Sequence, residues 1–486
     1  MTYLGKLNLL LPLILLLSAA TYEVVPWPQG RAPNGAAFND AVIDALSVEQ
    51  LERFEEFLEA DEYGEDREHI TVFQERIDEG RYDIETLFNF GDALFEHEFS
   101  MIDGWGSGDF GIQRVHQGDR GGLDGFSCAG CHSLGGADGA GTYQQNAFLY
   151  GDGIHISSTL QRNAPSLLGI GLIQSLAKEM TQTLRVLKQE AMNEALMTGQ
   201  TVTVNLLAKE ISFGQISATP EGEVITDRLE GIDSDLVVRP FGWKGEFATL
   251  RAFLEDAARI HFGIQSHGLA LRHQENPMPN KLGEGDWWDP DQDEVQRELE
   301  VGTITAGAIY LALLESPVII PPFDEKLRDI WARGSAIFDE ISCNECHVRT
   351  LTLTQSKWIE GPNMAQGEGV EISVFVDGLF PKSVPHVELF SDLKRHDLGS
   401  ELADEFDTPT GVNRQFFRTA PLWGVADTAP YLHDGRALTL TDAIEAHGGE
   451  AHYSREQFRN LSTDDQAALR VFLMSLTRPP SLRIAR

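Results

Sequence analysis

Apolar residues recur along much of the chain with the spacing of an α-helix. In residues 249–261 (TLRAFLEDAARIH) and 438–448 (LTLTDAIEAHG) they fall every three or four positions, which places them on one helical face. Residues 47–60 open with a capping-box pattern from Ser47 to Gln50, and the C-terminal stretch STDDQAALRVFLMSL also begins with residues that cap helices. The pattern predicts a mainly α protein built of helices and loops.

Two segments show the alternation of apolar and polar residues that is typical of strands. Within residues 200–240, TVTVNLL and DLVVR lie among Gly, Pro and Asp residues that favour turns. The stretch ISVFVDGLF at 372–380 has a similar character. We interpret both as small β insertions in a helical framework, the first of them at about residues 200–240.

The N-terminus has the pattern of a secretory signal peptide. A short segment with Lys6 precedes the apolar run LNLLLPLILLL at 7–17, and the small residues SAA follow at 18–20. The run is too short for a comfortable membrane span, although an uncleaved anchor is the alternative. No other run is long and apolar enough to cross a bilayer. We therefore expect cleavage after residues 1–20, export to the periplasm, and no stable membrane span afterwards.

The charge balance limits the class of partner. Asp and Glu number 75 against 38 Lys and Arg, which gives a formal net charge of −37. Nucleic acid is excluded as a partner because phosphate binding requires a basic surface. The negative field favours basic protein partners, and a solubilising surface for a salty habitat is the alternative interpretation.

One ordered set of features occurs twice. A stretch with Gly, a small apolar pair, Phe and an acid precedes each of two cysteine pairs, in GDALFEHEF (91–99) and GSAIFDEI (334–341). An Arg-x-Ala-Pro segment follows each pair, in RNAPSLLGIG (162–171) and RTAPLWGVAD (418–427). Because the order repeats while the spacers differ, we expect an internal duplication that gives two related domains.

All four cysteines belong to two copies of the pattern Cys-x-x-Cys-His. The residues concerned are Cys128, Cys131 and His132 in FSCAGCHSLGG, and Cys343, Cys346 and His347 in ISCNECHVRT. This pattern is the attachment signature of c-type haem: each cysteine forms a thioether with a haem vinyl group, and the adjacent histidine ligates the iron. A four-cysteine zinc site and two local disulfides are the alternatives, but neither explains the histidines. We predict two covalently bound haem c groups.

The patterns together divide the chain into four parts. They are a signal peptide at 1–20, a helical extension at 21–80, a first cytochrome c-like haem domain at 81–285 and a second one at 286–486.

The sixth ligand of each iron decides what the haem can do. For the second haem, His447 is the best candidate, because it lies on the predicted helix and adjacent glycines leave room for a haem edge. We expect His433 to be a structural residue. For the first haem, His155 stands just before the RNAP segment. Met180, Met192 and Met197 are its rivals, and an open coordination position is a further option.

With these residues in view, the chain resembles the di-haem oxidoreductase family, often labelled "thiol oxidoreductase", within the bacterial di-haem cytochrome c peroxidase superfamily. The resemblance spans about residues 80–486 and rests on the following stretches: FSCAGCH, RNAPSLLGIGLI, VRPFGWKG, CNECH, DLKRHDLGSELAD, RTAPLWGV, YLHDGRALTLTDAIEAHGGEA and FRNLSTDDQAALRVFLMSL. The "thiol" label finds no support here, because no cysteine stays free once both haems are attached.

The resemblance implies how the two haems are used. It implies two facing haem domains, with electron entry at the C-terminal haem and chemistry at the N-terminal one. His447 stands where relatives keep the distal ligand of the C-terminal haem, so bis-histidine ligation and a low potential are implied. His155 stands seven residues before Arg162, as the distal histidine does in peroxidases.

The chain departs from the peroxidase pattern at two places. Leu269 in FGIQSHGLAL takes the position of the catalytic glutamate, so His267 or His261 is the candidate replacement base. The tryptophan that peroxidases keep between the haems, shortly after RNAP, is missing, and Trp243 in FGWKG is no obvious substitute.

A calcium loop is a further candidate. In DPDQDEVQRELE, the acids Asp289, Asp291, Asp293 and Glu300 fall at positions 1, 3, 5 and 12 of an EF-hand. Position 6 should be Gly and is Glu294. The alternative is an acidic helix start, where aspartates cap the amide groups.

These observations predict a periplasmic di-haem c-type oxidoreductase. A small donor protein, a cytochrome c or a cupredoxin, would reduce the C-terminal haem, and a small-molecule oxidant or substrate would react at the N-terminal haem in peroxidase-like chemistry. His155 and His267 are the candidate catalytic residues. The alternative is a non-enzymatic electron-transfer protein with both irons six-coordinate.

Overall fold

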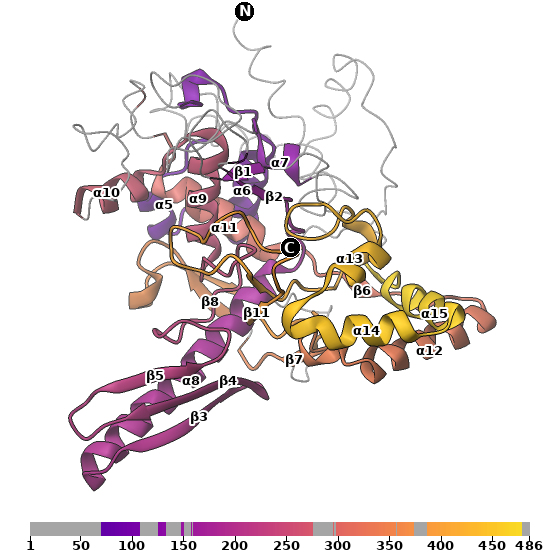
Figure 1. Cartoon of the computed structure of the whole chain (residues 1–486). Coiled ribbons are helices and arrows are strands. Elements are labelled where there is room, and N and C mark those ends of the chain that lie inside the picture. The colour runs from indigo at the N-terminus through magenta and orange to yellow at the C-terminus, as the bar shows by residue number, and fades with distance from the viewer. Residues whose placement is uncertain are drawn as a thin grey trace, which may run out of the picture.

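The structure is a computed structural model (Figure 1). It describes residues 70–106, 125–132, 147–149, 157, 159–275, 295, 298–355, 357–373 and 386–478, with the backbone alone for 272–275. The predicted signal peptide, the predicted helix at 47–60, His155, and the three aspartates of the candidate calcium loop lie outside the described residues.

The described chain is mainly helical with small sheets, in agreement with the predicted fold class. The helices are α5 (Gln74–Asp78), α6 (Ile84–Glu96), α7 (Cys128–Cys131), α8 (Ile170–Thr198), α9 (Leu250–Phe262), α10 (His267–Glu275), α11 (Val301–Leu313), α12 (Glu325–Glu340), α13 (Leu440–Ala446), α14 (His452–Asn460) and α15 (Thr463–Leu473). The two helices expected at 249–261 and at the C-terminus are confirmed as α9 and α15. Thr249 and Ser462 cap them by accepting hydrogen bonds from Ala252 and Asp465.

The strands form one three-stranded sheet and several two-stranded ones. The larger sheet has the order β3 (Val202–Ala208), β4 (Ile211–Ala218), β5 (Val224–Leu229). The antiparallel pairs are β1 (Ala147–Leu149) with β2 (Leu160–Arg162), β7 (Leu351–Thr352) with β10 (His386–Val387), β11 (Arg395–Asp397) with β12 (Phe416–Arg418), β6 (Val318–Ile319) with β13 (Leu476–Thr477), and β8 (Lys357–Glu360) with β9 (Val370–Ser373).

The prediction of a β insertion near residues 200–240 is confirmed in part. TVTVNLL forms β3, and the sheet packs on the long helix α8 to make an arm that projects from the rest of the chain (Figure 1). DLVVR forms no strand, so that prediction was wrong. Leu236 has a left-handed backbone with φ 58°, and the amide of Val238 donates instead to the side chain of Thr181. Of the stretch 372–380, the first two residues belong to β9 and the rest lie outside the described residues.

One helical core surrounds the helix that precedes the first cysteine pair. Helix α6 crosses α11 where Gly91 meets the carbonyl of Ala306, and a Cβ at this glycine would lie 2.3 Å from that oxygen. Helix α9 packs on α11 as well. Helix α11 is buried along most of its length, so its sequence shows no polar face that would have predicted it. It follows the predicted domain boundary at residue 286 but packs with α6 and α9, which precede it.

The second helical core repeats this kind of crossing before the second cysteine pair. Helix α12 crosses α15, and a Cβ at Gly334 would lie 1.9 Å from the carbonyl oxygen of Ala468. Phe338, Phe390 and Phe472 pack together there, and the guanidinium of Arg349 lies over all three rings. Figure 1 shows α12, α14 and α15 grouped apart from α5, α6, α9 and α11.

Among the described residues, no helix has the length and apolar character that crossing a bilayer requires.

Candidate functional site

The cysteines do not form the alternative sites that their number allows. None of the four makes a disulfide. Within the described part of the chain, the single group of possible metal ligands found close together is Cys346, Asp392 and His396, so the four sulfurs do not gather into a zinc site. Burial raises the pKa values of Cys128 and Cys343 to about 12 each. Both are therefore neutral thiols until they are modified.

The second Cys-x-x-Cys-His turn follows α12 and presents its histidine to a defined partner. The amide of His347 bonds to the carbonyl of Cys343 at 3.0 Å, and its Nδ1 lies 3.1 Å from the carbonyl oxygen of Phe390. A carbonyl can only accept, so Nδ1 carries the proton and Nε2 keeps its lone pair. Burial, followed by the nearby His447, lowers the pKa of His347 to about 4. The ring is thus the neutral tautomer that a metal ligand requires.

The backbone around Phe390 is arranged to aim that carbonyl. Three hydrogen bonds run from the amides of Phe390, Ser391 and Asp392 to the carbonyls of Arg349, Val348 and Cys346. Phe390 itself has a positive φ of 57°, which is uncommon for a large side chain. The segment is therefore locked onto the residues that flank His347.

His447 faces His347 across a space of the right size for an iron. The predicted helix 438–448 included His447, whereas in the structure α13 ends at Ala446 and His447 is its C-cap. The Nδ1 of His447 lies 2.7 Å from the carbonyl oxygen of Ala443. The two ring centroids are 6.4 Å apart. Two imidazoles on opposite sides of one metal, with metal–nitrogen bonds of about 2.0–2.1 Å, would have centroids about 6 Å apart. Burial lowers the pKa of His447, which favours the neutral ligand form.

Apolar residues that flank this pair of histidines in the chain belong to, or pack against, one core cluster. Phe390 and Leu440 belong to the second core cluster, and Tyr431 and Ile444 pack against it. Apolar walls exclude water and suit a large planar cofactor held by few polar contacts. The residues present thus fit a haem between His347 and His447.

The first Cys-x-x-Cys-His turn has the same local chemistry. Ser127 caps the short helix α7, and the amide of His132 bonds to the carbonyl of Cys128 at 3.1 Å. The Nδ1 of His132 lies 3.0 Å from the carbonyl of Pro165, in the RNAP segment, so this ring also keeps its Nε2 lone pair. The ring of Phe95, from α6, has its centroid 6.2 Å from that of His132.

The candidates for the sixth ligand of the predicted first haem differ in their surroundings. His155 lies outside the described residues. Met180 is fully buried in the main core, whereas Met197 is 79% exposed at the end of α8. Met192 packs on a small cluster between α8 and the arm sheet. The structure therefore gives Met192 and Met197 other surroundings and leaves His155 as a prediction.

His267 and Glu300, which the sequence assigned to different sites, lie next to each other. The Nδ1 of His267 is 3.6 Å from a carboxylate oxygen of Glu300, and both side chains are largely buried. Glu300 precedes α11 without capping it through its side chain. The neighbouring α9 approaches the first haem motif, because the amide of Gly125 donates to the carbonyl of His261. The roles of these two residues remain predictions.

A buried charge cluster joins segments that are far apart in sequence. Arg162 of the RNAP segment donates two hydrogen bonds of 2.8 Å to Asp404, and Lys244 of FGWKG lies 3.0 Å from the same carboxylate. His433 stacks on Phe417 and lies 3.5 Å from Asp404, which agrees with the structural role expected for it. Burial lowers the pKa of Lys244 to about 8. The cluster ties the first Arg-x-Ala-Pro segment to the second half of the chain.

Trp243 lies between the two Arg-x-Ala-Pro segments. Its Nε1 donates to the carbonyl of Asn163 at 2.8 Å, and its own carbonyl accepts from the amide of Arg418 at 2.9 Å. Trp243 stands about 80 residues from RNAP in the chain, so no local pattern predicts this contact. Trp243 therefore contacts the first Arg-x-Ala-Pro segment through its side chain and the second through its backbone.

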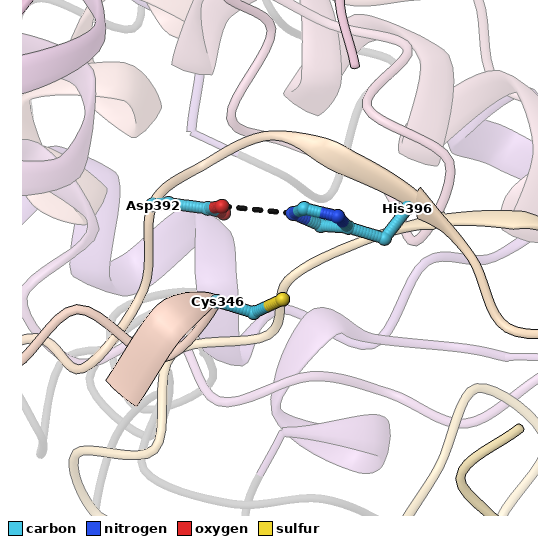
Figure 2. Close-up of side chains that lie close together, drawn as sticks. All are labelled: Cys346, Asp392 and His396. Atoms are coloured by element: carbon cyan, nitrogen blue, oxygen red, sulfur yellow. Dashed lines mark hydrogen bonds and ion pairs between the residues drawn. The ribbon is translucent and has the colours of Figure 1, made fainter. Parts of the chain in front are cut away.

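A second charged cluster lies beside Cys346 (Figure 2). His396 of β11 has its Nε2 2.8 Å from Asp392 and its Nδ1 2.7 Å from Glu450. Burial opposes the charged form, but the hydrogen bonds to Asp392 and Cys346 raise the pKa of His396 to about 11. Both ring nitrogens of His396 therefore face carboxylate oxygens, so both act as donors.

Sequence reasoning missed the roles of Trp243, Asp404, His396 and Glu450. Three of the stretches quoted for the family resemblance contain them: FGWKG, DLKRHDLGSELAD and HGGEA. For Asp404, His396 and Glu450, the available signal was a titratable side chain in such a stretch without an assigned ligand role.

Comparison with known proteins agrees with this site. Residues 325–476 match the family model described as "Di-haem oxidoreductase, putative peroxidase". Among solved structures, the chain is similar to hydrazine synthase of Kuenenia stuttgartiensis, with 15% identity over 94% of this chain and 99% of that chain and a TM-score of 0.36. It is also similar to a MauG-like protein associated with microbial copper homeostasis, with 17% identity over 54% of this chain and 79% of that chain and a TM-score of 0.27. No curated protein matches the chain. The residues that match this family model include the second Cys-x-x-Cys-His turn and His447.

Proposed function

We propose that the protein is a periplasmic di-haem c-type oxidoreductase. One haem c would be attached at Cys128 and Cys131, and the other at Cys343 and Cys346. The observation that carries the proposal is the pair His347 and His447, whose rings face each other with centroids 6.4 Å apart. Each donates its Nδ1 proton to a backbone carbonyl, so both Nε2 atoms are left as ligands.

The C-terminal haem would be the point of electron entry. Two neutral imidazoles favour the oxidised iron more than a His/Met pair does, which suits a centre that accepts electrons and passes them on. The net charge of −37 supports a basic donor, a small cytochrome c or cupredoxin, that is steered to the surface by electrostatic attraction. Export to the periplasm rests on the N-terminal signal pattern, and c-type haem attachment outside the cytoplasm is consistent with it.

The N-terminal haem would be the reactive centre. When bound, it would supply an iron able to exchange electrons with a small-molecule oxidant. The chain would hold it through His132, whose proton is fixed on Nδ1 by Pro165. His155 is the proposed residue on the opposite side. His267, beside Glu300, is the proposed proton donor or acceptor for the reacting oxidant.

The similar helix crossings support two related domains. Gly91 allows α6 to approach Ala306 of α11, and Gly334 allows α12 to approach Ala468 of α15. In both cases the helix that crosses is the one before a Cys-x-x-Cys-His turn. The same local device at both sites favours an internal duplication.

Electrons would pass between the haems along the junction held by Trp243. From His132, the route runs through the carbonyl of Pro165 to the RNAP backbone, and from there to Trp243. The carbonyl of Trp243 accepts from the amide of Arg418, so the route passes to Arg418 and along the backbone to Thr419. The carbonyl of Thr419 accepts from the hydroxyl of Ser391 at 2.7 Å. Ser391 is adjacent to Phe390, the partner of His347. Hydrogen bonds and covalent bonds thus connect the two proximal ligands without a gap.

Electron paramagnetic resonance of the fully oxidised and half-reduced protein tests the proposal. If the protein is an enzyme, we expect the C-terminal haem to be low-spin. We expect the N-terminal haem to become high-spin in the half-reduced form and to change its spectrum when peroxide is added. The control is Cys128→Ala/Cys131→Ala, which should keep the low-spin signal alone. If no high-spin signal appears and peroxide has no effect, the protein is the non-enzymatic electron-transfer module with both irons six-coordinate.

A further inference from the structure

The charged cluster beside Cys346 connects the two sides of the second haem site. His396 lies between Asp392, which is two residues after Phe390, and Glu450, which is three residues after His447. Phe390 orients the proximal histidine, and His447 is the proposed distal ligand. One side chain therefore bridges the segments that carry both axial positions.

On the proximal side, the link to the haem motif is short. The amide of Asp392 donates to the carbonyl of Cys346 at 2.9 Å. One oxygen of the Asp392 side chain accepts from the amide of Lys394, and the other faces His396 (Figure 2). Asp392 is buried, at 2% exposed, so its charge depends on these donors.

On the distal side, both oxygens of the Glu450 carboxylate are used. One accepts from His396 at 2.7 Å and the other from the amide of Asp397 at 2.9 Å. The loop between His447 and Glu450 also lies directly on this backbone. A Cβ at Gly448 would be 2.8 Å from the carbonyl of Leu398, and one at Gly449 would be 2.1 Å from that of Asp397.

We propose that His396, held by Asp392 and Glu450, is a positioning residue that keeps His447 on the iron of the C-terminal haem. The inference rests on the proposed function, because it takes His347 and His447 as the axial ligands. The Glu450 carboxylate anchors the loop after His447 through its hydrogen bonds with His396 and the amide of Asp397, and charge-assisted hydrogen bonds are the stronger kind. Without the hydrogen bonds of Glu450, the loop is free to move and His447 is drawn away from the iron.

A divalent cation held by Cys346, Asp392 and His396 is the competing interpretation of the same cluster. Both ring nitrogens of His396 face carboxylates, so both act as donors and neither offers a lone pair. The sulfur of Cys346 would be a thioether in the haem-loaded protein, which is a weaker ligand than a thiolate for such a cation. The cluster is therefore better suited to clamping the loop than to binding a metal.

The experiment compares Glu450→Gln and His396→Gln with the parent, using the full-length di-haem protein. The matched control is Glu401→Gln, whose exposed carboxylate pairs with Arg455 at 3.3 Å on the same half of the chain. The readouts are the low-spin signal of the C-terminal haem, its reduction potential, and the dissociation constant for cyanide at that iron. Glu450→Asp, which keeps the charge on a shorter side chain, serves as the conservative variant.

We expect both Gln variants to convert part of the low-spin signal to high-spin, to shift the potential, and to bind cyanide roughly tenfold more tightly. Glu450→Asp should give a spin state, potential and cyanide affinity between those of the Gln variants and those of the parent. Glu401→Gln should have the same three values as the parent. Variants that hold two haems with unchanged spin state, potential and cyanide affinity would overturn the clamp alone. A stoichiometric divalent metal lost with His396→Gln would also overturn it. A parent protein with no bis-histidine signal would overturn both the clamp and the proposed function.

Discussion

Replacing Asp404 with asparagine should destabilise the junction between the two halves of the chain. The carboxylate is buried and accepts two hydrogen bonds from Arg162 at 2.8 Å each, while Lys244, which is 0% exposed, lies 3.0 Å away. Removing one partner of a buried ion pair costs about 3–5 kcal/mol, because the remaining charge is left without compensation. Asparagine keeps one acceptor oxygen for Arg162. We therefore expect a loss near the lower end, about 3 kcal/mol.

The pH dependence of this loss gives a second check. Burial raises the pKa of Asp404, but the hydrogen bond and charge of Arg162, with Lys244, hold it below its ordinary value. A carboxyl with a depressed folded-state pKa contributes stability above its unfolded pKa and loses it as the pH falls through the folded value. The difference between parent and Asp404→Asn should therefore be largest near neutral pH and should shrink below about pH 4.

Urea unfolding followed by far-ultraviolet circular dichroism, at neutral and acidic pH, measures this difference. The control is Glu371→Gln, which removes an exposed pair with Lys357 and should change the midpoint little. A loss below about 1 kcal/mol at neutral pH, or one that does not depend on pH, would refute the reasoning that Asp404 is the buried counter-charge of Arg162 and Lys244.

Three further predictions concern single side chains. Trp243→Phe removes the hydrogen bond to Asn163, so electron exchange between the haems should slow in stopped-flow reduction, whereas an unchanged rate would exclude this route. His447→Met should raise the potential of the C-terminal haem in a redox titration, and an unchanged potential would mean that His447 is not a ligand. Burial raises the pKa of Glu246 to about 7, so the folded state holds its proton more tightly than the unfolded state and the melting temperature of the parent should fall from pH 4.5 to 7. Glu246→Gln should flatten that fall, and an equal slope in both proteins would contradict it.

Local sequence patterns predicted the elements whose signal is contained in a few neighbouring residues. The cap at Thr249 and the apolar spacing after it gave α9, and Ser462 gave α15. The two Cys-x-x-Cys-His turns needed only five residues each to be recognised. His447 could be chosen because glycines follow it, and the structure sets its ring opposite His347.

The remainder depends on pairs that are distant in sequence. Arg162 and Asp404 are 242 residues apart, and His396 and Glu450 are 54 apart, so no local period connects them. Helix α11 is apolar on nearly all sides and carries no amphipathic signal. DLVVR has strand-like composition, but the left-handed Leu236 and the bond from Val238 to Thr181 prevent pairing. Tertiary contacts decided these cases against local preference.

The central claim is that both Cys-x-x-Cys-His turns carry a covalent haem. The direct measurement is the intact mass of the denatured full-length protein, produced in a host that attaches c-type haem, together with Cys128→Ala/Cys131→Ala and Cys343→Ala/Cys346→Ala. The account predicts a mass excess of two haems for the parent and of one haem for each double variant. A parent mass without haem, or one that a double variant leaves unchanged, would contradict it.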